Sequence, residues 1–418
     1  QSPRSSAEYT GLMEQWGAHF TCIAPDSPGF GQSEPLAGEP EIEDFADAIA
    51  QFLAALGVQR CAAYGFHSGG IILVTALKRH PELFSCLAVG GYAIWTPDEI
   101  ALFGNRYLPP FQPSPYGEHL TWLWNRMLEQ SWFFPWFDVR DEARLTVAHA
   151  DIARVQQAVV EMLDAGDAYR AGYGAVLRAS RDIPPPDAQT PPVLIAAYDG
   201  DPLQQHIDRL GAMPAGWGAA KVRTPAELEE RALAFLRENA GGGAAPPLAE
   251  NFDEGWLALD GRLVHWRGER GAGAMVLHRP AGELAAPAAG EIAIDLPGHG
   301  LSDPIDRDHE ALLRHVMAEL GAAEMAAPVL PRGDPALLYP DLTPDRFGTH
   351  LLRAWSVARA EVLFDPWYAA DPDHALPVDP AAIVPAEIAL RARARLRAGD
   401  HALGWHELLE TMNLGDRR

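Results

Sequence analysis

The stretch at residues 64–70, YGFHSGG, restricts the possible fold more than any other part of the chain. It joins a short apolar run at residues 61–64 to a stretch with helical periodicity at residues 69–79. A turn of the form G-x-nucleophile-x-G between a strand and a helix holds one side chain out of the sheet, where it can react. The letters fit this form in two registers, which place either His67 or Ser68 at the tip.

Strand-like and helical stretches alternate around this turn. The expected strands lie at residues 22–26, 61–64, 87–89 and 191–198, and the expected helices at residues 41–56, 69–79 and 225–239. Residues 98–180 are rich in Trp and Phe and helical in pattern, so they are expected to form a helical insertion, or cap. The alternation predicts an α/β fold with a mostly parallel sheet and helical crossovers.

The composition limits the classes of partner. The formal net charge of -24 disfavours nucleic acid and anionic membrane surfaces. No apolar run is long enough to span a membrane. The three cysteines, Cys22, Cys61 and Cys86, show no C-x-x-C spacing, which predicts reduced core cysteines in a cytoplasmic protein and no metal site. We expect a protein that works without metal or organic cofactor on a small-molecule substrate.

The second half of the chain partly repeats the first. The sequence DSPGFGQS at residues 26–33 returns as DLPGHGLS at residues 295–302. Two further matches follow in the same order at a shorter offset: G-x-HL-x-x-x-W at residues 117–124 and 348–355, and Pro-Trp-aromatic at residues 135–137 and 366–368. Ordered matches of this kind indicate a tandem duplication.

The segment AGGGAAPPLAE at residues 240–250 is the predicted linker. It separates an α/β domain at residues 1–239 from a degenerate second copy at residues 251–418, with core strands expected at about 252–303 and cap-like helices at about 343–412. The second copy has no equivalent of YGFHSGG. In that interval stands VLPRGDPALLYP, which is too rich in proline to form a strand–turn–helix unit.

Together these motifs resemble the α/β-hydrolase superfamily. The resemblance rests on the D-x-PG-x-G-x-S turn, the G-x-nucleophile-x-G turn, the helical cap and a strand ending in x-x-Asp-Pro, and it covers nearly all of the first copy. Residues 1–3 (QSP) look like the family's H-G-x-P segment, whose counterpart in the second copy is residues 278–280 (HRP). The early strands of the family's sheet precede that segment in the second copy. For the first copy, they either precede Gln1 in the gene or are provided by the second copy.

The resemblance also favours one register of the turn. In the family, the second glycine begins a helix that often ends in a basic residue, His and Pro, as in KRHP at residues 78–81. This spacing places His67 at the tip. The other register would put Phe66 two residues before the tip, where glycine is needed because a bulky side chain crowds a strained turn.

The site that the resemblance implies departs from the family pattern. Asp201 matches the family's acid position, but the catalytic histidine that follows the last strand is missing from residues 216–233. We interpret His67 and Asp201 as a rearranged dyad, in which a neutral imidazole acts as general base or nucleophile. A decayed site, in which His67 only caps a pocket, and Ser68 as a true nucleophile both stay open.

The resemblance further implies binding residues. The backbone N–H groups of Ser2 and Ser68, with Gln1 beside them, match the oxyanion site, and His119 of the cap either faces the cleft or makes a structural hydrogen bond. The predicted function is hydrolysis or proton transfer on a small apolar carbonyl or ester compound; the alternative is a non-catalytic pseudo-hydrolase that binds a hydrophobic ligand or serves as a scaffold. The repeated cap predicts an intramolecular pseudo-dimer or a homo-oligomer.

Overall fold

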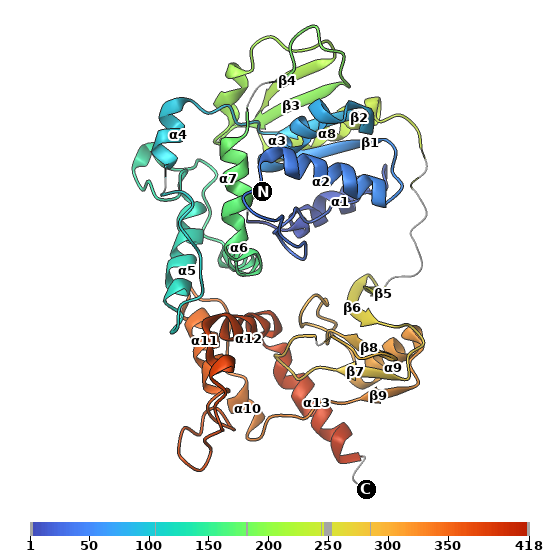
Figure 1. The fold of residues 1–418 in the computed structure, drawn as a ribbon, viewed down its shortest axis with the longest axis vertical. Coiled ribbons are helices and arrows are strands. Elements are labelled where there is room, and N and C mark those ends of the chain that lie inside the picture. Colours follow the sequence, from blue (N-terminus) through green and yellow to red (C-terminus); the bar gives the residue numbers. More distant parts are fainter. Residues whose placement is uncertain are drawn as a thin grey trace. The chain divides into compact units, whose positions relative to one another are not determined.

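The computed structural model of the 418-residue chain describes residues 3–104, 106–180, 183–243, 245, 253–284 and 286–415. The chain divides into two units (Figure 1). Unit 1 holds residues 1–112 and 125–248, and unit 2 holds residues 113–124 and 249–418. The short segment at residues 113–124 therefore belongs to unit 2, although it precedes most of the predicted cap in sequence.

Unit 1 is built on a four-stranded parallel sheet in the order β1-β2-β3-β4. Its strands are β1 (Cys61–Phe66), β2 (Phe84–Gly90), β3 (Val193–Tyr198) and β4 (Trp217–Val222). The strands predicted at residues 61–64, 87–89 and 191–198 are present. β4 was not predicted: Gly218 and Lys221 weaken its strand character, and its side chains alternate in burial.

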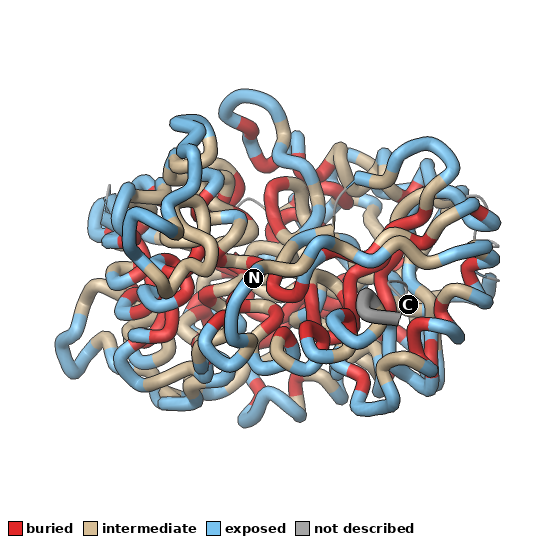
Figure 2. The backbone as a smooth tube through the Cα atoms, turned by 90° about the horizontal axis from the view of Figure 1, so that it is seen from below, coloured by how far each residue is buried: buried red, intermediate tan, exposed pale blue. Residues whose placement is uncertain are grey.

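Helices cover both faces of this sheet, as an α/β fold requires. On one face, α2 (Ile42–Ala55) and α3 (Ser68–Arg79) pack on Leu87 and Val89 of β2. On the other, α1 (Thr10–Trp16) and α8 (Pro225–Asn239) pack on Cys86 and Ala88. Because successive strand residues point to opposite faces, every residue of β2 is buried; Figure 2 draws buried backbone in red.

The predicted cap region contains the helices α4 (Pro97–Phe103), α5 (Glu118–Gln130), α6 (Ile152–Ala165) and α7 (Ala168–Arg178). Short 3₁₀ helices of unit 1 lie at Ser6–Tyr9, Pro81–Leu83, Asp141–Ala143 and Gln204–Arg209. α6 begins with the Asp151 carboxylate accepting from the backbone N–H groups of Ala153 and Arg154, and it ends at Gly166.

The strand predicted at residues 22–26 is absent. Residues 21–27 carry no regular secondary structure, and from Thr21 to Ala24 the side chains alternate between exposed and half-buried. The pattern is that of a strand, but a strand forms only where a neighbour satisfies its backbone groups. The described residues give this segment no strand partner, so the prediction from the apolar run alone was wrong.

Unit 2 contains a five-stranded mixed sheet in the order β5-β6-β8-β7-β9. The strands are β5 (Glu254–Leu259), β6 (Arg262–Gly268), β7 (Ala274–Leu277), β8 (Glu291–Ile294) and β9 (Glu324–Ala326). β5 and β6 form an antiparallel hairpin, whereas β7 runs parallel to both of its neighbours, β8 and β9. The strands β5 to β8 lie between Glu254 and Ile294, and β9 follows after α9.

The helices of unit 2 follow its sheet. They are α9 (His309–Leu320), α10 (Pro335–Leu338), α11 (Thr349–Ala360), α12 (Pro385–Ala398) and α13 (His401–Gly415), with a 3₁₀ helix at Pro380–Ile383. Only the four-residue helix α10 forms in the proline-rich stretch at residues 329–340. Among the described residues of the chain, no helix combines the length and the apolar composition that crossing a membrane needs.

Within unit 2, the two copies of the G-x-HL-x-x-x-W motif contact each other reciprocally. His119 packs edge-on against Trp355 at 4.9 Å between ring centroids, and His350 packs edge-on against Trp124 at 5.1 Å. Gly117 and Gly348, both with positive φ, leave no room for a Cβ atom, because it would lie within 3.0 Å of the opposing indole. Each motif thus binds the tryptophan of the other.

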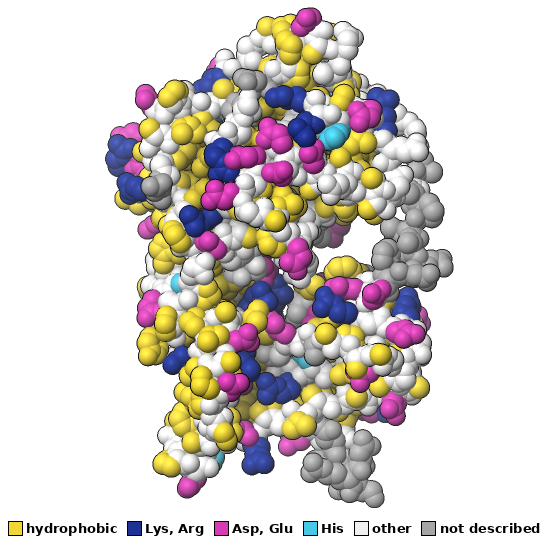
Figure 3. Space-filling view, viewed as in Figure 1, with side chains coloured by type: hydrophobic (Ala, Val, Ile, Leu, Met, Phe, Trp, Pro, Cys, Tyr) yellow, Lys and Arg dark blue, Asp and Glu magenta, His cyan; other side chains and the backbone are white. Residues whose placement is uncertain are grey.

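The repeated D-x-PG-x-G-x-S turns also have the same geometry in the two units. Asp26 Oδ2 accepts from the Gln32 backbone N–H at 2.9 Å, and Asp295 Oδ2 accepts from the Leu301 N–H at 3.0 Å. In each turn the serine hydroxyl donates to the carbonyl of the aspartate, at 2.9 Å and 2.8 Å respectively. On the face shown in Figure 3, acidic and basic side chains are interspersed.

Candidate active site

His67 occupies the junction of β1 and α3 in a backbone conformation that side chains rarely adopt. Its φ is 49° and its ψ is -109°, and it precedes the first residue of α3, Ser68. The His67 backbone N–H donates to the Gly90 carbonyl at 2.7 Å, which fixes the turn to the end of β2. Strained residues of this kind persist where the surrounding structure holds them, and they cluster at functional sites.

Two glycines make room for this turn. A Cβ atom on Gly65 would lie 2.6 Å from the backbone carbon of Gly69, so the position two residues before His67 accepts only glycine. A Cβ atom on Gly91 would lie 2.6 Å from the His67 ring and 3.0 Å from Asp201 Oδ2. Gly65 is recognisable in the sequence as the first glycine of the G-x-nucleophile-x-G turn, whereas Gly91 has no signal there beyond its position after Gly90 at the end of β2.

Asp201 lies beside His67 although 134 residues separate them in sequence. His67 Nε2 is 3.1 Å from both carboxylate oxygens of Asp201. The Leu203 backbone N–H donates to Asp201 Oδ1 at 2.8 Å and holds the carboxylate in place. The Asp201 side chain is fully buried, whereas that of His67 is 17% exposed. An ion pair or hydrogen bond to such a buried carboxylate fixes the orientation of the imidazole.

Aromatic side chains surround this pair. The Phe66 ring stacks on the His67 ring at 4.0 Å, and the Tyr198 ring lies parallel to that of Phe66, with 6.4 Å between centroids. Burial raises the pKa of Tyr198 to about 12, and it also raises the pKa values of Tyr9 and Tyr64. These three phenols therefore stay neutral at physiological pH and offer O–H groups rather than charges.

The segment after Pro3 is held beside the turn by two carboxylates. The Ser6 backbone N–H donates to Asp26 Oδ1 at 2.6 Å, and the Ser5 hydroxyl donates to Glu161 Oε1 at 2.8 Å. Arg4 forms an ion pair with Glu161 at 2.5 Å. Burial raises the pKa of Glu161, and Arg4 opposes this shift. Gln1 and Ser2, the predicted oxyanion-site residues of this segment, lie outside the described residues.

Ser68 is half-buried and borders a large groove of about 940 Å³. As the first residue of α3, it has a backbone N–H that the helix itself does not use. The lining of the groove does not include the His67–Asp201 pair.

His119 is not brought to this pair. It lies in the segment that belongs to unit 2, where the Ser114 backbone N–H donates to its Nδ1 at 3.1 Å and its ring packs on Trp355. Burial lowers the pKa of His119 to about 4, so the side chain is neutral at physiological pH. Among the described residues, no group of His, Cys, Asp and Glu side chains has the geometry to hold a metal ion.

Comparison with known proteins gives matches to part of the chain. The profile of a family described as "alpha/beta hydrolase fold" matches residues 3–97. A haloalkane dehalogenase of Mycobacterium tuberculosis is 28% identical over 102 residues, which are 24% of this chain and 36% of that protein. A putative carbamate hydrolase of Pantoea ananatis is 36% identical over 73 residues, 17% of this chain and 26% of that protein. The chain thus spans about a quarter to a third of the length of these curated relatives.

Solved structures match a larger share of the chain at low identity. An esterase from Thermogutta terrifontis is 16% identical, with a TM-score of 0.42, over 57% of this chain and 86% of that chain. A hydrolase from Pseudomonas aeruginosa is 19% identical, with a TM-score of 0.43, over 56% of this chain and 86% of that chain.

Proposed function

We propose that the chain is a cofactor-independent hydrolase-like enzyme of the α/β-hydrolase superfamily, whose base is His67, oriented by Asp201. The observation that carries this proposal is the approach of His67 Nε2 to within 3.1 Å of both oxygens of a fully buried carboxylate. A buried carboxylate that orients an imidazole is the arrangement by which serine hydrolases prepare their base. Here the imidazole itself stands at the strained turn.

In the proposed reaction, the Nε2–H of His67 donates to Asp201, and the other ring nitrogen, Nδ1, serves as the base. Nδ1 takes a proton from water while the water oxygen attacks the substrate carbonyl. The backbone N–H of Ser68 stabilises the oxyanion that forms. The tetrahedral intermediate then collapses, and the imidazolium returns the proton to the departing alcohol or thiol. The substrate class is a small, mostly apolar ester, lactone or thioester.

This proposal is tested by the rates at which p-nitrophenyl esters, lactones and thioesters are hydrolysed. His67→Ala is expected to abolish turnover above the rate in buffer, whereas Ser68→Ala, which keeps the backbone N–H, is expected to retain it. Loss of turnover only in Ser68→Ala would make Ser68 the nucleophile and reverse the assignment. Thermal unfolding of both variants checks that the fold is kept.

The second candidate is a non-catalytic pseudo-hydrolase that binds an apolar ligand or serves as a scaffold. Two observations favour it: residues 216–233 supply no histidine to complete a standard triad, and the large groove is lined by Ser68 rather than by the His67–Asp201 pair. If no protein turns over any substrate of the panel while a fluorescent fatty acid binds to wild type, this second function is the better account.

We also propose that the matched motifs form an intramolecular pseudo-dimer, the product of a tandem duplication. The reciprocal packing of His119 on Trp355 and of His350 on Trp124 supports this view, since an isologous interface pairs each residue with its counterpart in this way. The proposal predicts a monomeric particle by light scattering at micromolar concentration. A stable homodimer would favour the homo-oligomer instead.

A further inference from the structure

A second, smaller cleft of about 190 Å³ is formed entirely by residues of unit 2. One wall is the segment at residues 279–283, which follows β7, and another is the helix α12. Leu338, Tyr339 and Glu361 contribute to the rest of the lining. A cleft of this volume has room for one small organic molecule, since a single water takes up only about 30 Å³ of the liquid.

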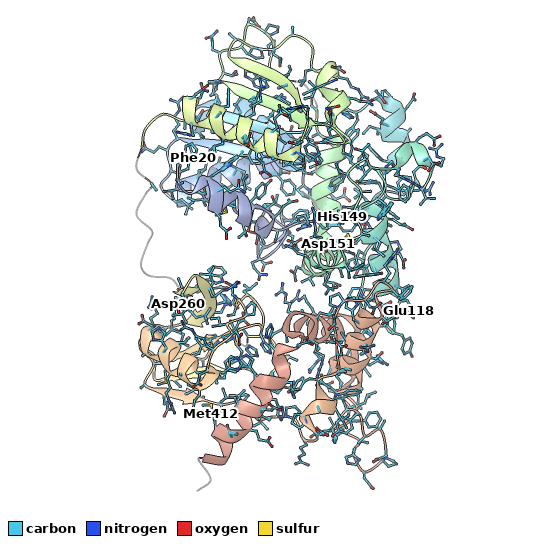
Figure 4. The ribbon with its side chains drawn as sticks, turned by 180° about the vertical axis from the view of Figure 1, so that it is seen from behind. Phe20, Glu118, His149, Asp151, Asp260 and Met412 are labelled. Atoms are coloured by element: carbon cyan, nitrogen blue, oxygen red, sulfur yellow. The ribbon has the colours of Figure 1, made fainter. Side chains whose placement is uncertain are left out.

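The helices α6 and α12 occupy matching places in the two halves of the sequence. Both begin and end at a constant offset of 233 residues (152 to 385 and 165 to 398), and a glycine with positive φ follows each of them. Figure 4 labels Asp151, the residue that precedes α6. At this offset Glu161 of α6 corresponds to Ala394 of α12, so a buried carboxylate of unit 1 is replaced by a methyl group in unit 2.

In unit 1 this carboxylate is bound by the segment that follows QSP. Arg4 forms an ion pair with Glu161 at 2.5 Å. In unit 2 the matching segment follows HRP, and the counterpart of Arg4 is Ala281. Ala281 and Ala394 both line the cleft. The cleft of unit 2 therefore lies where the matching residues of unit 1 hold a carboxylate.

The cleft carries positive charge that unit 1 does not have at the matching positions. Three arginines line it, namely Arg279, Arg391 and Arg395. Their counterparts in unit 1 are the uncharged residues Ser2, Ala158 and Met162. Arg279 and Arg391 form no ion pair with the residues that the structure describes, and among these residues the buried Nε of Arg391 has no hydrogen-bond partner. A buried donor of this kind is costly unless a ligand accepts from it.

The carboxylates at the cleft do not cancel this charge. Glu361 is bound by Arg395, whose Nε donates to Glu361 Oε2 at 3.1 Å. Glu283 is bound by Arg393 of α12 at 3.0 Å. Of the three acidic residues in the lining, only Glu387 is left to face the two arginines without ion pairs. The cleft thus keeps one net positive charge and favours a ligand with one negative charge.

We propose that the cleft of unit 2 binds a small aliphatic carboxylate. Arg279 and Arg391 bind its carboxylate group, and Leu338 and Ala394 contact its short apolar part. The planar fork of N–H groups on a guanidinium matches the two oxygens of a carboxylate, which makes arginine well suited to such a ligand. The volume of the cleft limits the apolar part to a short chain. This inference does not depend on the proposed function of His67.

The test compares hexanoate with hexanamide, its neutral analogue, by isothermal titration calorimetry on the full chain. Hexanoate is expected to bind about tenfold or more tightly than hexanamide, because hydrogen bonds to a charged group contribute more than those to a neutral one. No binding of hexanoate would overturn the proposal, and so would equal binding of the two probes. Tighter binding of inorganic phosphate than of hexanoate would also overturn it, since the cleft would then select anions of another class.

Two substitutions on α12 locate the bound probe. Arg391→Gln removes a charge that lines the cleft, and it is expected to weaken hexanoate binding about tenfold or more. Arg397→Gln removes a charge from the same helix outside the lining, and it should leave the affinity within about twofold of wild type, because solvent and salt screen more distant charges. Equal effects of the two substitutions would contradict the proposal.

A third variant, Ala394→Glu, restores the carboxylate that unit 1 carries at the matching position. It is expected to abolish hexanoate binding, because the new side chain fills the cleft and pairs with its arginines. Circular dichroism and thermal unfolding check that the variant is folded, and the comparison of Arg391→Gln with Arg397→Gln decides the question if it is not. Undiminished binding of hexanoate to folded Ala394→Glu protein would refute the assignment of the site.

Discussion

Gly91 packs directly against both members of the proposed dyad, and a methyl group added there tests whether the pair is held as described. Gly91 has φ of 63°, and a Cβ atom would lie 2.6 Å from His67 Cδ2, 2.9 Å from His67 Nε2 and 3.0 Å from Asp201 Oδ2. Gly91→Ala must therefore strain the backbone and also push His67 away from Asp201. Gly57 offers a matched control in the same unit, because its φ is 70° and a Cβ atom there would meet nothing within 4 Å.

The two variants share one cost and differ in the other. A left-handed conformation costs a non-glycine residue about 1–2 kcal/mol, which applies to both Gly57→Ala and Gly91→Ala. Overpacking adds about 1–3 kcal/mol, which applies to Gly91→Ala alone. We expect urea unfolding to show a loss of about 1–2 kcal/mol for Gly57→Ala and about 2–5 kcal/mol for Gly91→Ala. Hydrolysis, where present, should fall only in Gly91→Ala. Equal losses of stability in the two variants would refute the geometry of the site.

Three further results are expected. Asp201→Asn should lower kcat about a hundredfold or more with little change in KM, as measured by steady-state kinetics on the best substrate of the panel; a rate within about twofold of wild type would remove Asp201 from the mechanism. Burial lowers the pKa of His299 to about 3. Below pH 6.5 the unfolded chain therefore binds a proton at this histidine that the folded chain does not bind. The free energy of unfolding should fall by about 1.4 kcal/mol per pH unit as the pH drops from about 6.5 towards 3. His299→Phe, which introduces the residue found at the matching position of unit 1, should flatten this slope in urea unfolding at pH 7 and 4.5, and an unchanged slope would contradict the assignment. Trp124→Ala and Trp355→Ala should each lower the free energy of unfolding of unit 2 by about 3–5 kcal/mol, because both indoles are almost fully buried. A much smaller loss for one variant than for the other, measured by calorimetry, would contradict reciprocal packing.

The sequence predicted those elements of the fold whose pattern is local. α2 and α8 were placed to within a residue because their apolar residues recur with helical spacing and Gly or Pro marks their surroundings. The D-x-PG-x-G-x-S turns were also recognisable, because the aspartate, glycines and serine that stabilise each turn lie within eight residues.

Features that depend on partners distant in sequence were not predictable in this way. Residues 22–26 have the composition of a strand, but a strand needs a neighbour, and no local pattern reports its absence. Likewise, the sequence suggested that His67 and Asp201 belong together but not how closely they approach. The separation of 3.1 Å results from the parallel order of β1, β2 and β3, which brings the ends of distant strands to one edge.

The role of Gly91 illustrates the same limit. A Gly-Gly pair at the end of a strand is ordinary turn chemistry, and only the positions of His67 and Asp201 show why a side chain is excluded there. His119 shows the converse. Its place in a predicted cap made it a candidate for the cleft, yet its packing on Trp355 depends on a segment far along the chain.

The central claim is that His67, and not Ser68, is the reactive group at the turn. The most direct measurement treats the protein with an excess of a fluorophosphonate, which forms a stable bond to an activated serine oxygen, and then records both the hydrolysis rate and the mass of the peptide that contains residues 67 and 68. The account predicts that Ser68 carries no phosphonate and that hydrolysis of the best panel substrate is unchanged. A stoichiometric adduct on Ser68 together with loss of hydrolysis would contradict it.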